Sequence, residues 1–152
     1  MAAEFEPKNS EFEAQVRESF ARQQLMATIG AQLTHVAPGA VEIELPFSER
    51  LTQQHGFLHA GVVAAAMDSA CGYAALTLMD GEAAVVTVEF KINLLEPAAG
   101  ERLVARGRVV RAGRTLTVCR GEAIAVVGNT ERHVATMTAT MMAVRGRDGM
   151  RG

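Results

Sequence analysis

One aspartate interrupts a long stretch of small and apolar residues. Residues 58 to 79 are almost wholly apolar or small, and Asp68 lies near their middle. A charged carboxylate is costly to bury unless it is paired or hydrogen-bonded, so this position needs partners or a chemical role. On a helix, Gly61, Ala65, Asp68 and Gly72 would share one face. Asp68 is therefore expected in a groove lined by small residues, which could admit a ligand or seat a neighbouring strand.

The residues before this expected helix carry groups suited to acyl transfer. Gln53 and His59 precede it, and its first turn, near Ala60 and Gly61, leaves backbone N–H groups unpaired. Such a helix end attracts negative charge, including the charge that develops on a carbonyl oxygen under attack. With a carboxylate two turns further along, the pattern favours hydrolysis. The structural alternatives are a surface loop role for Gln53 and a helix-start hydrogen bond for His59.

This pattern resembles that of the hotdog-fold thioesterases of the PaaI-like group, which runs Asn, then HGG, then Asp. In this chain His59-Ala60-Gly61 is followed by Asp68 nine positions after the histidine, and Gln53 lies six positions before it. The resemblance covers residues 25 to 145, including the order of helix and strands. Gln53 replaces the commoner Asn, and Ala60 replaces the first Gly, a change that keeps the backbone N–H.

The resemblance implies roles for the matching residues at the helix. The backbone N–H of Ala60, with Gly61 beside it, would bind the thioester oxygen, and Asp68 would act as general base or nucleophile. The family's site typically forms across a dimer, with the aspartate and the helix-start N–H from opposite subunits. Dimers in the family commonly pair into tetramers, so a homo-oligomer is expected.

Three further residues complete the site that the resemblance implies. Gln53 would help to place the thioester or the attacking water, and His59 would support that corner. A hydroxyl on the following strand, here Thr87, would orient water as in some members. An exposed strand residue is the alternative interpretation of Thr87.

Coenzyme A needs cations for its phosphates. Arg106, Arg108, Arg111 and Arg114 cluster around the VVRAGRTL turn, where the family commonly uses basic residues for the nucleotide portion of the ligand. We expect Arg106, Arg111 and Arg114 to serve this purpose, and Lys91 is a weaker candidate. Solvated strand ends are the alternative interpretation.

No metal and no separate cofactor are expected, since CoA is part of the substrate. His55 and His59 are four residues apart, but the intervening GFL lacks the acid of a zinc-protease motif. His35 and His133 are isolated in the sequence. Cys71 and Cys119 have no metal-like spacing and are expected to be free, buried thiols.

The composition narrows the partner classes. The chain has 152 residues, of which 49% are hydrophobic and 21% charged, as in an ordinary globular protein. A net charge of −2 and an aromatic content of 5% argue against nucleic-acid binding. The N-terminal residues lack the basic start and apolar core of a signal peptide, which favours the cytoplasm. Residues 58 to 79 are long enough for a membrane span, but the central aspartate argues against one.

The element pattern predicts an α+β fold, in which a mostly antiparallel curved sheet wraps around one long helix. Ser10 and Glu13 form an expected capping box, and Phe12, Val16 and Phe20 make the apolar stripe of an N-terminal helix. Period-two alternation and turn residues predict the strands, which we place at residues 27–36, 40–46, 85–95, 102–110, 115–127 and 133–144.

Strict alternation in the strand at residues 85–95 has one specific consequence. It places Val88 and Phe90 on one face and Thr87 and Glu89 on the other.

For the whole chain we expect an N-terminal helical extension at 1–24, a hotdog thioesterase domain at 25–145 and a flexible tail at 146–152.

The sequence therefore favours an acyl-CoA thioesterase that releases a free acid and CoA from an aryl- or medium-chain acyl-CoA. A hotdog hydratase or dehydratase fits less well, because those sites usually need a differently spaced histidine and acid. From another class, a non-catalytic acyl-CoA-binding sensor or scaffold remains the alternative. Turnover of acyl-CoA distinguishes binding from catalysis.

Overall fold

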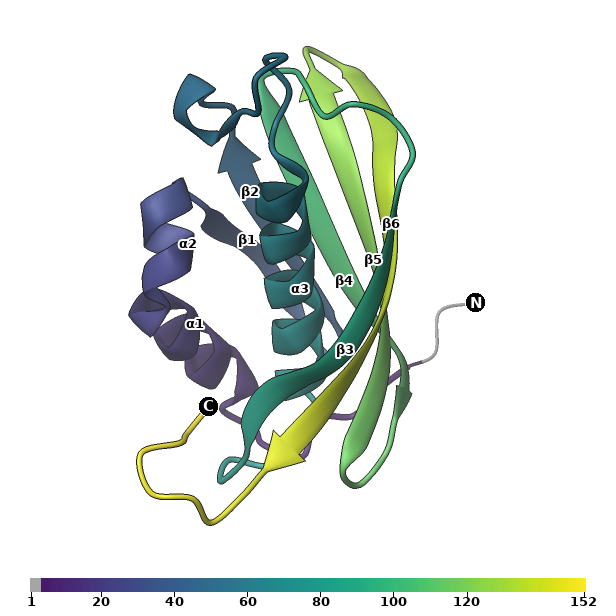
Figure 1. Cartoon of the computed structure of the whole chain (residues 1–152). Helices are drawn as coiled ribbons and strands as arrows, with labels where there is room; N and C mark the ends of the chain where they lie inside the picture. The colour runs from purple at the N-terminus through teal and green to yellow at the C-terminus, as the bar shows by residue number, and fades with distance from the viewer. Residues whose placement is uncertain (1–3) are drawn as a thin grey trace.

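A long helix of small residues lies in the concavity of a curved, six-stranded sheet (Figure 1). This computed structural model describes residues 4–152. The helices are α1 (Phe12–Arg22), α2 (Gln24–Ile29) and α3 (Ala60–Leu76), with a short 3-10 helix at Glu49–Leu51. The strands are β1 (Gln32–Ala37), β2 (Ala40–Pro46), β3 (Ala84–Leu94), β4 (Arg102–Ala112), β5 (Leu116–Val127) and β6 (Thr130–Val144).

The strand order in the sheet is β1-β2-β4-β5-β6-β3, and every neighbouring pair is antiparallel. The predicted fold class, a curved antiparallel sheet around one long helix with an N-terminal helix, is confirmed. β1 and β3 form the two edges of the sheet. In Figure 1, α1 and α2 lie beside α3, and the lower end of β3 comes close to α1.

Glycine allows β4 to approach α3 at backbone distance. A Cβ on Gly107 would lie 2.3 Å from the backbone carbonyl carbon of Ala70 and 2.6 Å from the backbone nitrogen of Cys71. Gly121 lies opposite Gly107 on β5, and a Cβ there would meet the Cys71 Sγ at 3.1 Å. Because neither glycine has a side chain, the middle of α3 can pack directly against the middle of the sheet.

The C-terminal end of α3 is fixed by a buried hydroxyl. Thr77 is fully buried, and its Oγ1 accepts a hydrogen bond from the Gly39 N–H at 2.7 Å and donates to the Ala74 carbonyl at 2.6 Å. This contact joins the helix to the β1–β2 turn. The contacts at Gly107 and Thr77 together define both the height and the rotation of α3 over the sheet.

The N-terminal helix packs on α3 through the predicted stripe. Val16 is fully buried, and the Phe20 ring meets the Tyr73 ring of α3 edge to face with a centroid distance of 5.9 Å. The proposed division at residues 24 and 25 stays a prediction, and residues 1–3 of the proposed extension lie outside the described residues.

The predicted capping box is wrong. The residue that precedes α1 is Glu11, which makes no side-chain capping bond. Instead, the Asn9 side chain accepts a hydrogen bond from the Glu11 N–H at 3.0 Å, so an Asx turn leads into the helix. Ser10 and Glu13 have the right spacing, but the helix begins later than their pattern requires.

The first predicted strand begins too early. Residues 24 to 29 form α2, whose Gln, Leu, Met and Ala residues are good helix formers. Gly30 ends it with φ +76°, and the Ala31 N–H bonds back to the Met26 carbonyl at 2.9 Å. The strand itself starts at Gln32, as β1.

No helix within residues 4–152 has the length and hydropathy to cross a membrane. Among the same residues, no group of three or more His, Cys, Asp or Glu side chains is arranged to bind a metal ion.

The close approach of β4 to α3 gives a matched pair of stability variants. Gly107→Ala should lower the free energy of unfolding by at least ~1–3 kcal/mol, because the added methyl meets helix backbone that cannot move aside. Gly121→Ala should be milder, because its nearest neighbours are side-chain atoms. Urea unfolding of both variants measures the difference, and equal losses would contradict a helix position set at Gly107.

Candidate active site

Asp68 and Thr87 are brought together by the fold. The Thr87 Oγ1 donates a hydrogen bond to the Asp68 Oδ1 at 2.7 Å, joining the middle of α3 to β3. Asp68 is half-buried and Thr87 is exposed at the rim. The two residues line a cavity of about 310 Å³ together with Gly72. The carboxylate thus has one fixed partner and one side open to a ligand.

A β-bulge turns Thr87 toward the helix. On β6, Met141 pairs with Thr87 and Ala139 pairs with Phe90, and both β6 side chains are fully buried on the inner face. The pairing shifts by one residue between Thr87 and Glu89, so Thr87 and Phe90 share the inner face. The strict alternation expected from the sequence is wrong here, because the bulge adds one residue to the strand.

β3 is less buried than its alternating pattern predicted. Val88, Phe90 and Leu94 are 52%, 41% and 53% exposed, and β3 is an edge strand with no neighbour on one side. Exposed apolar side chains beside free backbone hydrogen-bonding groups are typical of a strand that pairs with another chain.

The environment of Asp68 favours its protonated form. Burial raises the pKa of this carboxyl above its usual value of 3.8, and the hydrogen bond from Thr87 opposes the shift. A carboxylate whose pKa lies above the usual range, beside a cavity, is suited to accept a proton or to attack an acyl carbon.

The start of α3 presents one uncommitted backbone donor. His59 caps the helix, with its Nδ1 accepting a hydrogen bond from the Gly61 N–H at 2.8 Å. The Ala60 N–H has no acceptor within residues 4–152 and lies at an exposed position. Of the two N–H groups expected at this corner, Gly61 is therefore engaged in the cap, and Ala60 is free for a ligand oxygen. His59 accepts through Nδ1, so its proton is on Nε2 when the ring is neutral.

Gln53 organises the loop before the helix. Its side-chain Oε1 accepts hydrogen bonds from the His55 N–H at 2.6 Å and the Phe57 N–H at 3.4 Å. The Gln53 backbone N–H donates to the Phe57 carbonyl at 2.8 Å. The amide oxygen is occupied, so the group that Gln53 can offer a ligand is its Nε2 donor.

The structure divides the predicted site between two cavities. Asp68 and Thr87 line the first, whereas Gln53 and Ala60 line a second cavity of about 460 Å³. Ala60 and Asp68 are eight residues apart on one helix, which corresponds to about 12 Å along its axis. A single small reacting group cannot contact both within one copy of the chain.

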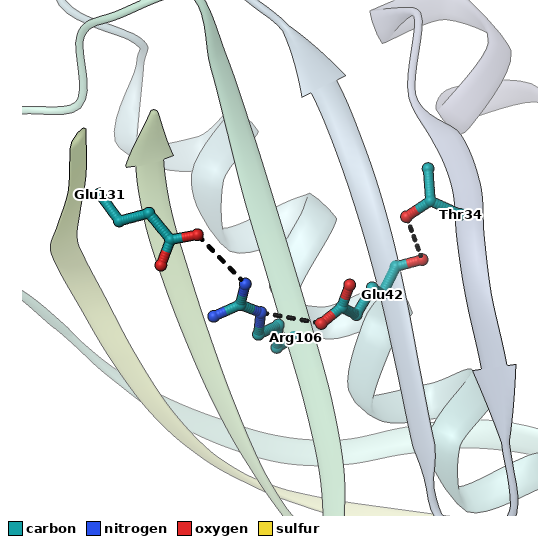
Figure 2. Close-up of polar contacts among 4 residues, drawn as sticks. All are labelled: Thr34, Glu42, Arg106 and Glu131. Carbon is teal, nitrogen blue, oxygen red and sulfur yellow. Dashed lines mark hydrogen bonds and ion pairs between the residues drawn. The ribbon is translucent and has the colours of Figure 1, made fainter. Parts of the chain in front are cut away.

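Of the arginines expected to bind CoA phosphates, Arg106 has carboxylate partners. Its Nε lies 2.8 Å from Glu42 Oε1 and its Nη2 lies 3.6 Å from Glu131 Oε1, on the sheet face opposite α3 (Figure 2). Thr34 donates to the Glu42 carbonyl oxygen in the same group at 3.4 Å. These pairs neutralise the Arg106 guanidinium, so Arg106 is less suited to bind CoA phosphates than Arg111 or Arg114.

Arg111 and Arg114 lie at the end of β4 and in the turn that follows it. Both are exposed, and neither forms an ion pair within residues 4–152. The Val109 N–H bonds to the Gly39 carbonyl, and Gly39 contacts Thr77, so this hairpin lies near the C-terminal end of α3.

Sequence reasoning missed one wall of the Asp68 cavity. Ser69 and Tyr73 on α3, and Ser19 and Gln23 from the N-terminal segment, also line it. Ser69 and Tyr73 are four residues apart and share a helix face, but they stand one and five positions after Asp68, so helical spacing does not place them on its face. No local pattern marks the other two, since their approach depends on how α1 packs.

A family model supplies the first comparison. Residues 55–132 match the model of the thioesterase superfamily. A crystal structure of a thioesterase family protein from Silicibacter pomeroyi is 57% identical, with a TM-score of 0.87, and covers 89% of this chain and 99% of that one.

Two Escherichia coli proteins extend the comparison. Medium/long-chain acyl-CoA thioesterase YigI is 31% identical over 99 residues, which are 56% of this chain and 61% of that protein. The structure of the PaaI protein from the phenylacetic acid degradation operon is 18% identical, with a TM-score of 0.81, and covers 90% of this chain and 95% of that one, which is a likeness of fold.

The curved sheet and its enclosed helix define a hotdog-fold protein. The chain belongs to the thioesterase superfamily, and it is a thioester hydrolase.

The raised pKa of Asp68 has a measurable effect on stability. Above pH 3.8 the unfolded chain releases this proton while the folded chain retains it, so the contribution of Asp68 to the free energy of unfolding falls as the pH rises through the raised pKa. Asp68→Asn lacks this step. We expect the variant to match the native protein near pH ~3 and to exceed it in stability at pH ~7, as measured by urea unfolding. A variant that is less stable than the native protein at neutral pH would contradict this account.

Proposed function

We propose that this protein hydrolyses an acyl-CoA thioester with an aryl or medium-chain acyl group. The observation that carries the proposal is the pair of complementary half-sites, a carboxylate with an open side at Asp68 and an uncommitted N–H at Ala60. The name of the YigI relative, an acyl-CoA thioesterase, supports CoA as the thiol part of the substrate.

The reaction needs three events at the thioester. The Ala60 N–H donates to the carbonyl oxygen and stabilises the negative charge that develops there. Asp68, as general base, takes a proton from the attacking water or, as nucleophile, attacks the carbonyl carbon itself. In the base route, the tetrahedral intermediate expels the CoA thiolate and leaves the free acid, and the proton taken up by Asp68 passes to the thiolate. In the nucleophile route, loss of the thiolate leaves an anhydride between the acyl group and Asp68, and one water hydrolyses it to the free acid and the regenerated carboxylate. Both routes require the ionised carboxylate.

Supporting groups position the reactants. Thr87 fixes the orientation of the Asp68 carboxylate through its 2.7 Å hydrogen bond. The Gln53 Nε2 can donate to the thioester or to the water, and His59 holds the helix start in shape through Gly61. Arg111 and Arg114 are the cations proposed for the CoA phosphates.

Two copies of the chain are proposed to complete each site. The Asp68 cavity includes Thr87, at the beginning of β3, and the Ala60 cavity includes Leu94, at its end. Antiparallel pairing of two β3 edges would place the beginning of one strand beside the end of the other and would cover the exposed Val88 and Phe90. Asp68 of one protomer would then face Ala60 of its partner, in a dimer that can pair into a tetramer.

The assay measures CoA release from acyl-CoAs that include phenylacetyl, hydroxybenzoyl and medium-chain members. Cys71 and Cys119 add little background to a thiol reagent, because both are buried and burial raises the pKa of the Cys119 thiol to about 12. Turnover supports hydrolysis. Acyl-CoAs that raise the melting temperature without being consumed would instead indicate a binding module.

Two substitutions remove the proposed groups with little change in shape. Asp68→Asn keeps an oxygen that can accept from Thr87. Ala60→Pro replaces the N–H by a ring carbon without disturbing the helix start, since proline fits the first position of a helix and the preceding His59 has φ −60° and ψ 136°. We expect a loss of kcat of ~10²–10³ for Ala60→Pro, and at least as large a loss for Asp68→Asn.

Asp80→Asn is the matched control, because Asp80 forms a surface pair with Arg145 at 2.7 Å. It should retain native kcat. Folded Asp68→Asn and Ala60→Pro proteins with native kcat would overturn the proposed roles.

A further inference from the structure

The N-terminal segment forms one wall of the Asp68 cavity. Ser19, Arg22 and Gln23 line the cavity from the end of α1 and its junction with α2. In Figure 1, α1 and α2 lie beside α3. This wall precedes the part of the chain that matches the family model, which begins at residue 55. The carboxylate on α3 is therefore partly enclosed by a segment that lies outside the matched region.

Gln23 fixes this wall to α3. It stands between α1 and α2, where its φ of −79° and ψ of 102° interrupt the helix. Its Nε2 donates to the Tyr73 hydroxyl oxygen at 3.0 Å, and its Oε1 accepts from the Ser69 Oγ at 2.9 Å. Ser69 and Tyr73 are four residues apart on α3, so the amide of one glutamine spans a turn of the helix. These two hydrogen bonds are called the Gln23 latch below.

Apolar side chains anchor the helices on both sides of this junction but not the junction itself. In α1, the Phe20 ring packs edge to face on the Tyr73 ring, and in α2 Met26 is fully buried. Between Phe20 and Met26, every residue other than Gln23 is exposed. The position of the junction over the cavity therefore depends on the Gln23 latch.

We propose that Gln23 is a positioning residue for the reaction, because its latch holds the α1–α2 junction over the Asp68 cavity and limits the access of bulk water to the carboxylate. The inference rests on the proposed acyl-CoA hydrolysis. A carboxylate that is partly shielded from bulk water is a stronger base than a solvated one. Gln23 has no contact with the reacting atoms of the proposed mechanism, so its effect passes through Asp68.

Few ionisable groups share the surroundings of Asp68. Arg22 of α1 and Tyr73 of α3 line the cavity, and Cys71 is a neighbour on α3, where burial raises the pKa of its thiol. Among the described residues, β3 contributes only uncharged side chains to the cavity. Burial raises the pKa of the Asp68 carboxyl, the hydrogen bond from Thr87 lowers it, and no charged neighbour adds to the shift. Opening of the wall should therefore lower this pKa.

Gln23→Met tests the latch, because methionine keeps the length of the side chain and removes both hydrogen bonds. We expect the acid limb of the kcat/KM profile, which reports the ionisation of Asp68 in the free enzyme, to move to lower pH as water reaches the carboxylate. Ser69→Ala removes one of the two bonds and should move the limb part of the way. Because Ser69 acts through Gln23, the double variant should shift no further than Gln23→Met alone.

Amide hydrogen exchange measures the opening of the wall directly. The backbone N–H of Gln23 bonds to the Phe20 carbonyl, and that of Ala31 bonds to the Met26 carbonyl, so these amides report on the ends of α1 and α2. Exchange at both amides should be ~5- to 100-fold faster in Gln23→Met, the combined effect of two net hydrogen bonds.

Gln15→Met is the matched control. Gln15 is another half-buried glutamine of α1, and its Nε2 donates to the Ala83 carbonyl at 3.5 Å, away from the cavity. A purely structural role of the N-terminal segment would lower kcat/KM equally at every pH, so this variant should keep the native acid limb. In the proposed dimer the partner's His59 would also approach Asp68. Every variant retains that histidine, so a difference between their profiles belongs to the carboxylate.

The outcomes separate the two proposals. Native turnover that depends on Asp68, with the same acid limb in the native protein and Gln23→Met, overturns the positioning role and leaves acyl-CoA hydrolysis intact. Equal shifts in Gln23→Met and Gln15→Met also overturn it, because the effect would not be specific to the junction. Absence of turnover with every acyl-CoA overturns both proposals. A shift in Gln23→Met and Ser69→Ala that is absent in Gln15→Met supports the inference.

Discussion

The backbone contact between α3 and β4 determines the rest of this structure. Because Gly107 has no side chain, the helix lies directly on the sheet at Ala70, and Gly121 extends the same allowance to β5. Asp68 is two residues before this contact, so its orientation toward β3 follows from the packing. A helix raised by one methyl group would carry the carboxylate away from Thr87 and would change the shape of the cavity between them.

The bulge in β3 is the second constraint on the site. It breaks the two-residue period between Thr87 and Glu89 and turns a hydroxyl toward Asp68. Sequence periodicity placed Thr87 on the wrong face, whereas the family motif gave it a role in the site. The extra residue of a bulge has no marked signature here, because Val88 suits a regular strand as well as a bulged one.

The other differences between sequence and structure also arise from packing over distance. The long helix, the later strands and the position of Asp68 follow from local patterns of apolar and small residues. The capping role of Asn9 depends on where α1 starts, and the partners of Arg106 come from two other strands. Two local signals for α2 were not used by strand periodicity, namely the helix-forming residues from Gln24 to Ala27 and the terminating Gly30.

The helix start and the carboxylate occupy separate cavities in one copy of the chain, so the central claim is that two copies share each site. The most direct measurement is the CoA release rate of mixed oligomers, formed by co-expressing Asp68→Asn and Ala60→Pro chains. Each mixed dimer would combine the intact Asp68 of one chain with the intact Ala60 of the other. We expect activity to return well above that of either variant alone, with one working site per mixed dimer. Mixed oligomers that are as inactive as the separate variants would show that both groups act within a single chain, and would contradict the account.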